Sequence, residues 1–143
     1  MPTPDPGRQR FAAYGLVVDD RRRVLLVRAS SAAAVPGVWY PPGGGVEYGE
    51  HPEQAVLREL SEETGYVGRV IELCSIVSDT VDRADPADQP IHSIRLIYRL
   101  ELVSGELRDE AGGTTDRAAW VTAQDATTLT LAGFLAPLLA EAG

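Results

Sequence analysis

The sequence predicts one α/β domain with a mixed β-sheet, and three observations support this fold class. A helical pattern runs from Pro52 to Thr64 between strand-like segments. Apolar and polar residues alternate along most of Ile94–Leu102, as they do in a long half-buried strand. The expected order is hairpin, loop, helix, several strands and terminal helix, which is not a repeat of βαβ units. A chain of 143 residues is long enough for one domain with a hydrophobic core.

The first expected elements are a disordered start and a β-hairpin. Residues 1–10 lack the apolar segment of a signal peptide, so we expect a disordered lead-in and assign the single domain to 11–143. The apolar runs 11–20 and 23–29 are joined by a polar turn and predict the hairpin. The three arginines at 21–23 are expected to be solvated there.

The helix expected at 52–64 has clear start and stop signals. Proline suits the first helical position, because the N–H that it lacks would have no partner within the helix. Gly65 suits the position just after the last turn. His51 precedes the helix and is expected to cap it or to lie on the surface. The face that the helix would naturally bury carries Val56, Leu57, Leu60 and Thr64.

After this helix the chain reads as strands and polar loops before a last helix. Strands are expected at 67–79, 93–102 and 118–122, and a helix at 131–142. Pro137 should kink or reposition that helix. The polar segment 80–90 is a candidate rim of the substrate site. Cys74 is the one cysteine, which excludes an internal disulfide and fits a reducing cytoplasm; we expect it to be buried.

Charge and hydropathy exclude two classes of partner. The formal net charge is -8 and the pI is near 4.7, so sequence-independent binding of nucleic acid through a basic surface is not expected. No apolar run approaches the roughly 20 residues that a membrane-spanning helix needs. If this acidic chain handles phosphates, a divalent cation held by carboxylates would have to neutralise them.

The acids at the end of the expected helix are in an unfavourable position. Glu59, Glu62 and Glu63 share one face of its last two turns, where each acid opposes the helix dipole at a cost of roughly 0.3–1 kcal/mol. Arg58 can offset only part of this through a contact with Glu62. The simple interpretation is a solvated acidic face. The alternative is a cation site, since hard ions such as Mg²⁺ pair carboxylates with substrate phosphates.

The glycine cluster Gly43–Gly45 lies a short distance before the acidic helix. Three glycines allow the backbone to approach a ligand closely and to present N–H or carbonyl groups to it. Many such clusters are only turns. No Gly-Lys-Ser/Thr follows, so this is not a Walker loop.

These residues together resemble a known signature. Gly44, five residues, Glu50, seven residues and the run RELSEETGY at 58–66 look like the complete motif of the Nudix hydrolases. Tyr66 replaces the usual aliphatic residue, a mild departure from the motif. The resemblance implies an α/β/α sandwich and hydrolysis, dependent on Mg²⁺ or Mn²⁺, of a nucleoside diphosphate linked to another moiety.

The resemblance also implies roles for the residues of the motif. The implied metal ligands are the side chains of Glu59, Glu62 and Glu63 and the backbone carbonyl of Gly43. Arg58 would orient the carboxylates, and Glu50 would support them or bind a further metal. Water would attack phosphorus within a pyrophosphate.

The general base is left open by the motif. Glu63 is one candidate, and an acid in a loop outside the motif is the other. The loop offers Glu106, Asp109, Glu110 and Asp116. We favour Glu110 among these four, although all four would also suit a solvated loop.

Further candidates for substrate contact lie outside the acidic helix. They are Gly44 and Gly45 in the glycine cluster, Trp39 just before it, and Arg28 and His92 on strands. Trp39, with its neighbour Tyr40, could stack on a base, but a tryptophan there more often packs under the turn. Arg28 could bind a phosphate or simply lie on a solvated strand face.

Markers of substrate class beyond the motif are missing. Thr80 stands where Nudix enzymes that act on ADP-ribose carry a proline, and 81–83 lack the tyrosine typical of dinucleoside polyphosphate hydrolases. This slightly favours a nucleoside triphosphate or related nucleotide, with a sugar-nucleotide or ADP-ribose-type pyrophosphatase as the alternative. A non-catalytic nucleotide sensor on the same fold is the alternative of another class, and RNA 5′-end processing is disfavoured by the charge. The resemblance alone suggests a homodimer.

Overall fold

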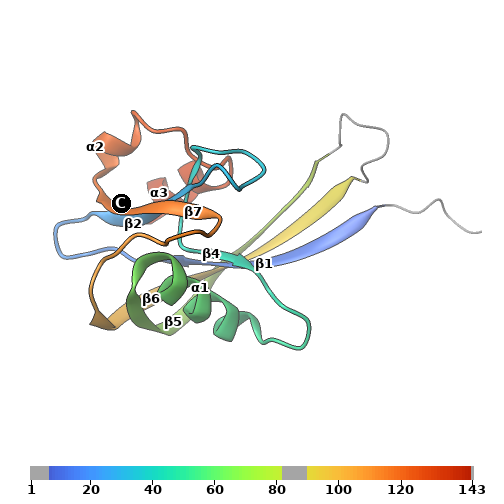
Figure 1. The fold of residues 1–143 in the computed structure, drawn as a ribbon, viewed down its shortest axis with the longest axis horizontal. Helices are drawn as coiled ribbons and strands as arrows, with labels where there is room; N and C mark the ends of the chain where they lie inside the picture. The colour runs from blue at the N-terminus through green and yellow to red at the C-terminus, as the bar shows by residue number, and fades with distance from the viewer. Residues whose placement is uncertain (1–6, 82–89, 143) are drawn as a thin grey trace, which may run out of the picture.

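The computed structural model describes residues 7–81 and 90–142, which form two β-sheets and three helices (Figure 1). In chain order the elements are β1 (Arg8–Leu16), β2 (Val24–Ala29), β3 (Trp39–Tyr40), β4 (Gly43–Gly45), α1 (Pro52–Thr64), β5 (Tyr66–Val81), β6 (Ile91–Gly105), β7 (Thr115–Val121), α2 (Ala123–Ala126) and α3 (Leu135–Ala142). Within this described part of the chain, one sheet has the order β4-β1-β6-β5 and the other the order β3-β2-β7. Its helices are all too short or too polar to cross a bilayer.

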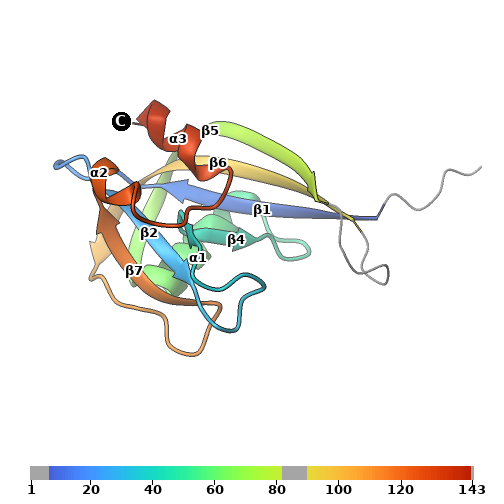
Figure 2. The same cartoon turned by 90° about the horizontal axis from the view of Figure 1, so that it is seen from above.

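The larger sheet is mixed, as expected. β1 runs parallel to β6 and antiparallel to β4, and β5 runs antiparallel to β6. Successive residues of β1 point to opposite faces, so Tyr14 packs beside α3 and Ala13 packs beside α1. The two helices lie on opposite sides of this sheet (Figure 2), which confirms the α/β/α arrangement.

The expected β-hairpin at 11–29 is wrong in one respect. β1 and β2 belong to different sheets and meet only next to the turn, where Val18 pairs with Val24 and the Leu25 N–H donates to the Val17 carbonyl. β1 gains its partners from β4 and β6 instead, so the two runs separate.

The turn between β1 and β2 is organised by Asp19. Its Oδ1 accepts from the backbone N–H groups of Arg21 and Arg23, and its Oδ2 forms an ion pair with Arg23 at 2.8 Å. Arg21 and Arg22 are exposed. The expectation of a solvated basic turn is confirmed for these two residues.

The ordered domain begins earlier than expected. Arg8, Gln9 and Arg10 are part of β1 and pair in parallel with Ile91, His92 and Ser93 of β6. The disordered lead-in therefore does not extend through residues 8–10. The rest of that assignment, residues 1–6, and most of the expected rim at 80–90 lie outside the described residues.

The central helix α1 has the expected bounds. His51 is its N-cap, and its Nδ1 accepts from the Glu53 N–H at 3.0 Å. Gly65 adopts φ 83°, and its N–H donates to the Ser61 carbonyl at 3.0 Å. Ala55, Val56 and Leu60 are fully buried against the sheets, and Glu63 is buried beside them, where it meets the glycine strand.

Two expectations for the later elements are corrected. Cys74 is exposed, because β5 is an edge strand with register shifts that leave several of its apolar side chains uncovered. The last helix starts at Leu135 instead of 131, with Pro137 in its first turn, where proline needs no partner for a backbone N–H.

Candidate active site

Three carboxylates occupy the end of α1 and differ in exposure. Glu63 is only 3% exposed, Glu59 is half-buried, and the Glu62 side chain is 51% exposed. The Glu63 Oε1 accepts the backbone N–H of Gly43 at 2.8 Å. This bond joins the last turn of α1 to β4 and fixes the buried carboxylate at the glycine strand.

Gly43 is required by close packing, and Gly44 lies against a carboxylate of α1. Gly43 has φ 152°, and a Cβ there would collide with the Ala13 backbone and with Tyr14. A Cβ on Gly44 would lie 2.9 Å from Oε1 of Glu59. The strand therefore approaches the α1 carboxylates more closely than any residue with a side chain would allow.

Arg58 lies at the centre of the carboxylates. Its guanidinium contacts Glu50 through Nε at 2.9 Å and Nη2 at 3.0 Å, and Glu59 through Nη1 at 3.0 Å. It also reaches Glu62 at 3.5 Å and donates to the Gly45 carbonyl at 3.3 Å. The expected Arg58–Glu62 contact is present, but it is the longest of these bonds to a carboxylate.

The surroundings shift the pKa values of three carboxylates, two upward and one downward. Burial raises the pKa of Glu63 well above its usual value; the Gly43 N–H opposes this, and the charges of Glu59, Glu110 and Glu62 raise it further. Burial also raises the pKa of Glu59, with Arg58 opposing. Hydrogen bonding to Arg58 lowers the pKa of Glu50 to about 2. Two crowded acids thus resist ionisation while Glu50 is ionised as the partner of Arg58.

These residues fit a hard divalent cation by their chemistry. All the side-chain donors are carboxylate oxygens, which Mg²⁺ and Mn²⁺ prefer over softer metals. Burial is the main cause of the raised pKa values of Glu59 and Glu63, and repulsion by neighbouring acids adds to it; a cation would oppose both effects. Within residues 7–81 and 90–142 no three acidic, histidine or cysteine side chains are already gathered as a metal-binding group. Arg58 and the Gly43 N–H each hold one carboxylate oxygen of Glu59 and Glu63.

A cleft of about 570 Å³ opens beside the glycine strand. Glu59 and Glu63 form one wall of it. Further lining comes from β1, β2, β3 and β6 and from the loop 32–35, and it includes the side chains of Arg10, Tyr14, Tyr40, Ser93 and Arg95. The cleft therefore joins an acidic wall to aromatic and basic residues.

Of the five candidates for substrate contact, the structure brings Gly44 and Gly45 into the cleft and leaves three elsewhere. Trp39 is 6% exposed and packs in the core, while its neighbour Tyr40 lines the cleft. Arg28 forms an ion pair with Asp116 at 2.7 Å. His92 is bonded to Ser78 at 2.8 Å and to Gln9 at 3.2 Å, because its neighbours on β6 take the cleft side.

The four loop acids have different environments. Asp109 accepts the Ala118 N–H at 2.8 Å, Asp116 pairs with Arg28, and Glu106 is exposed. Glu110 is held by the N–H and hydroxyl of Thr115 at 3.3 and 3.2 Å. It is also the loop acid whose charge acts on Glu59 and Glu63.

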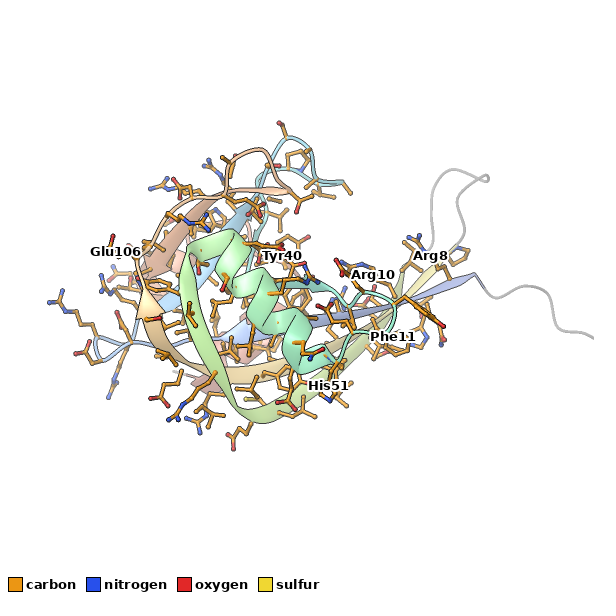
Figure 3. All side chains as sticks on the ribbon, turned by 60° about the horizontal axis from the view of Figure 1, so that its bottom comes forward. Arg8, Arg10, Phe11, Tyr40, His51 and Glu106 are labelled. Carbon is orange, nitrogen blue, oxygen red and sulfur yellow. The ribbon has the colours of Figure 1, made fainter. Side chains whose placement is uncertain are left out.

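Several cleft residues were not anticipated from the sequence. The sequence predicts Arg10 to lie in a disordered start, and no local pattern marks Ser93 or Tyr14 as a site residue. The side-chain alternation of a strand beginning at Arg8 would have placed Arg10 and Tyr14 on one face. Figure 3 shows Arg10 and Tyr40 near α1.

Comparison with known proteins agrees with this geometry. The family model described as NUDIX domain matches residues 8–142. An ADP-ribose pyrophosphatase of Methanocaldococcus jannaschii is 36% identical over 68% of this chain, which corresponds to 53% of that protein. The chain thus spans about half the length of that relative. Nucleoside triphosphatase NudI of Escherichia coli is 32% identical over 82% of this chain and 85% of its own length.

A solved structure also matches the fold. The NUDIX hydrolase from Nitrosomonas europaea has a TM-score of 0.75 and 22% sequence identity. The match covers 94% of this chain and 87% of the other.

Proposed function

The chain belongs to the NUDIX family, and on that premise we propose that it hydrolyses a pyrophosphate bond in a nucleotide with the help of Mg²⁺ or Mn²⁺. The substrate would be a nucleoside diphosphate linked to another group, attacked by water at phosphorus. The observation that carries this proposal is the buried Glu63 carboxylate, bonded to Gly43 at the wall of a cleft that also contains Tyr40 and Arg95. A buried acid of raised pKa in a cleft is typical of functional sites.

The α1 carboxylates would hold the cation together with the backbone of β4. We assign Glu59, Glu62, Glu63 and the Gly43 carbonyl as ligands. When bound, the cation neutralises phosphoryl oxygens and makes water a better nucleophile. The protein supplies the positions: the Gly43 N–H fixes Glu63, and Arg58 holds Glu50 beside the ligands.

Glu110 is our candidate for accepting the proton of the attacking water. The Thr115 hydroxyl donates to the Glu110 carboxylate and holds it in place. The charge of Glu110 raises the pKa values of Glu59 and Glu63. An acid outside the ligand set can accept a proton without giving up a bond to the cation. Glu63 is the second candidate for this role.

The favoured substrate class is a nucleoside triphosphate or related nucleotide. In support, the Escherichia coli nucleoside triphosphatase aligns over most of both chains. The archaeal ADP-ribose pyrophosphatase is slightly more identical over a shorter segment, which makes ADP-ribose or a sugar-nucleotide the second candidate. Thr80 in place of the proline associated with ADP-ribose hydrolysis favours the first class.

The direct test is a substrate panel with Mg²⁺ or Mn²⁺. Nucleoside triphosphates, ADP-ribose, sugar-nucleotides and dinucleotides are incubated with the protein, and phosphate, pyrophosphate and nucleotide products are measured. We expect turnover of at least one class and its loss in Glu59→Gln. Nucleotide binding without turnover of any member would overturn the proposal and establish a sensor on the same fold.

A further inference from the structure

Arg10 is unusual among the arginines of this acidic chain. Half of the arginines in the described residues form ion pairs with carboxylates, as Arg28 does with Asp116 and Arg95 with Asp79. Arg10 has no carboxylate partner in residues 7–81 and 90–142. Other arginines without such a partner, such as Arg8 and Arg21, are exposed, whereas Arg10 is half-buried in the cleft.

Arg10 lies next to the glycine strand. It lies on β1 two residues before Ala12, which pairs with Gly45 of β4. The Arg10 Nη2 is 3.8 Å from the position that a Cβ on Gly45 would take. Adjacent residues of a strand face opposite ways, so Gly44 faces Glu59 while Gly45 faces Arg10. The strand β4 thus has the Glu59 carboxylate on one side and the Arg10 guanidinium, which has no carboxylate partner in the described residues, on the other.

Two clefts meet at this point. Arg10 and Gly45 line the cleft beside Glu63, and they also line a second cleft of about 600 Å³ that continues past Phe11 and Tyr48. A linear molecule that lay across both clefts would pass the guanidinium. A planar fork of N–H donors suits phosphoryl oxygens, which accept two parallel hydrogen bonds.

Tyr14 limits the positions that the Arg10 side chain can take. The Tyr14 ring is 5% exposed and packs on Tyr40 at 6.2 Å and on Phe134 at 5.0 Å between ring centroids. Burial raises the pKa of Tyr14, and the guanidinium of Arg10 beside its hydroxyl is the largest opposing influence. The fixed phenol of Tyr14 holds the Arg10 guanidinium through a hydrogen bond without neutralising its charge.

We propose that Arg10 binds a phosphoryl group of the substrate across β4 from the α1 carboxylates, with Tyr14 as the residue that positions it. This inference rests on the proposed function. The acids of α1 repel an anionic substrate. Arg10 supplies a positive group in the cleft, and this group forms no ion pair with a carboxylate of the described residues. Arg10 should therefore determine affinity for phosphate groups, while the α1 acids determine turnover.

The test compares Arg10→Gln, Arg10→Lys and Tyr14→Phe with the wild-type protein. Calorimetry gives Kd for inorganic pyrophosphate, and kinetics give KM and kcat for the substrate that the panel identifies. We expect Arg10→Gln to raise both Kd and KM by about tenfold or more, with kcat within about threefold. Arg10→Lys should recover part of the affinity, since it keeps the charge and loses the fork. Tyr14→Phe should give a smaller rise in KM.

The matched control is Arg21→Gln, which makes the same change of net charge in the exposed turn and should leave Kd and KM unchanged. If Arg10→Gln keeps Kd and KM within about twofold of wild type while turnover persists, the Arg10 assignment is overturned and the proposed function stands. A loss of kcat and thermal stability together, without recovery in Arg10→Lys, would also overturn it. A wild-type protein that neither binds pyrophosphate nor hydrolyses any panel member overturns both proposals.

Discussion

The substitution Glu62→Gln removes one charge from the last turn of α1 and keeps the size of the side chain. Glu62 is 51% exposed and its contact with Arg58 is 3.5 Å long. Removing an acid from a helix C-terminus gains roughly 0.3–1 kcal/mol, and losing an exposed ion pair costs about 0–1 kcal/mol. The free energy of unfolding should therefore change by less than about 1 kcal/mol, or within about 4 °C in Tm.

Turnover should respond very differently from stability. If Glu62 is a ligand of the cation, Glu62→Gln should lower kcat by about a hundredfold or more, since even residues that support metal ligands cost 10–100-fold. Phosphate release with saturating Mg²⁺ measures the rate, and thermal unfolding without metal measures stability. The expected pair of results is a Tm that is unchanged or higher and a rate that is nearly lost.

Glu53→Gln is the matched control for Glu62→Gln. Glu53 is an exposed acid in the first turn of the same helix, where its negative charge interacts favourably with the helix dipole. Its substitution should lower Tm slightly and leave turnover unchanged. Turnover of Glu62→Gln within about threefold of wild type would refute the assignment of Glu62 as a ligand. A Tm lower by more than about 4 °C would refute the reasoning about the helix end.

Three further predictions concern the surroundings of the acidic face. Gly44→Ala should lower turnover by about tenfold or more with little loss of stability, because its Cβ would lie 2.9 Å from the Glu59 Oε1 and displace that side chain; a wild-type rate would contradict this. Arg58 lowers the pKa of Glu50 from 4.5 to about 2, so the stability that Glu50 provides is complete above pH 4.5 and is lost as the pH falls toward 2. Denaturant unfolding across that range should show a weaker pH dependence in Glu50→Gln, and identical curves would exclude this contribution. Glu110→Gln should lower kcat by about a hundredfold with KM unchanged if Glu110 accepts the proton, and unchanged kcat would leave Glu63 in that role.

The bounds of α1 were predictable because their causes are local. Pro52 and Gly65 mark the ends through backbone chemistry that holds in any fold. The acids at 59, 62 and 63 share a face by helix geometry alone, and their poor fit to the dipole is visible without coordinates. The acidic part of the candidate site could therefore be predicted from the sequence.

The basic and aromatic half depends on contacts between distant segments. Arg10 reaches the cleft because β1 pairs in parallel with β6, which lies more than eighty residues later in the chain. No local signal fixes this pairing. The same long-range pairing separates β1 from β2, so a turn that reads as a hairpin joins two sheets.

Which of two adjacent strand residues faces the cleft could also not be predicted from the sequence. Trp39 and Tyr40 are both aromatic and both precede the glycine strand. Residue alternation requires that they face opposite sides, but only the packing of Trp39 into the core decides which of them lines the cleft. The exposure of Cys74 has a similar cause, since an apolar strand is buried or exposed according to its place in the sheet.

Calorimetric titration of the purified protein with Mn²⁺ or Mg²⁺ tests the central claim most directly. We predict saturable uptake of the ion by the wild-type protein, strengthened by a nucleotide, and much weaker uptake by Glu59→Gln and Glu63→Gln. Each of these variants loses a charged oxygen donor and keeps the shape of the side chain. Absence of ion uptake by the wild-type protein, with and without nucleotide, would contradict the claim that the carboxylates of α1 form a metal site.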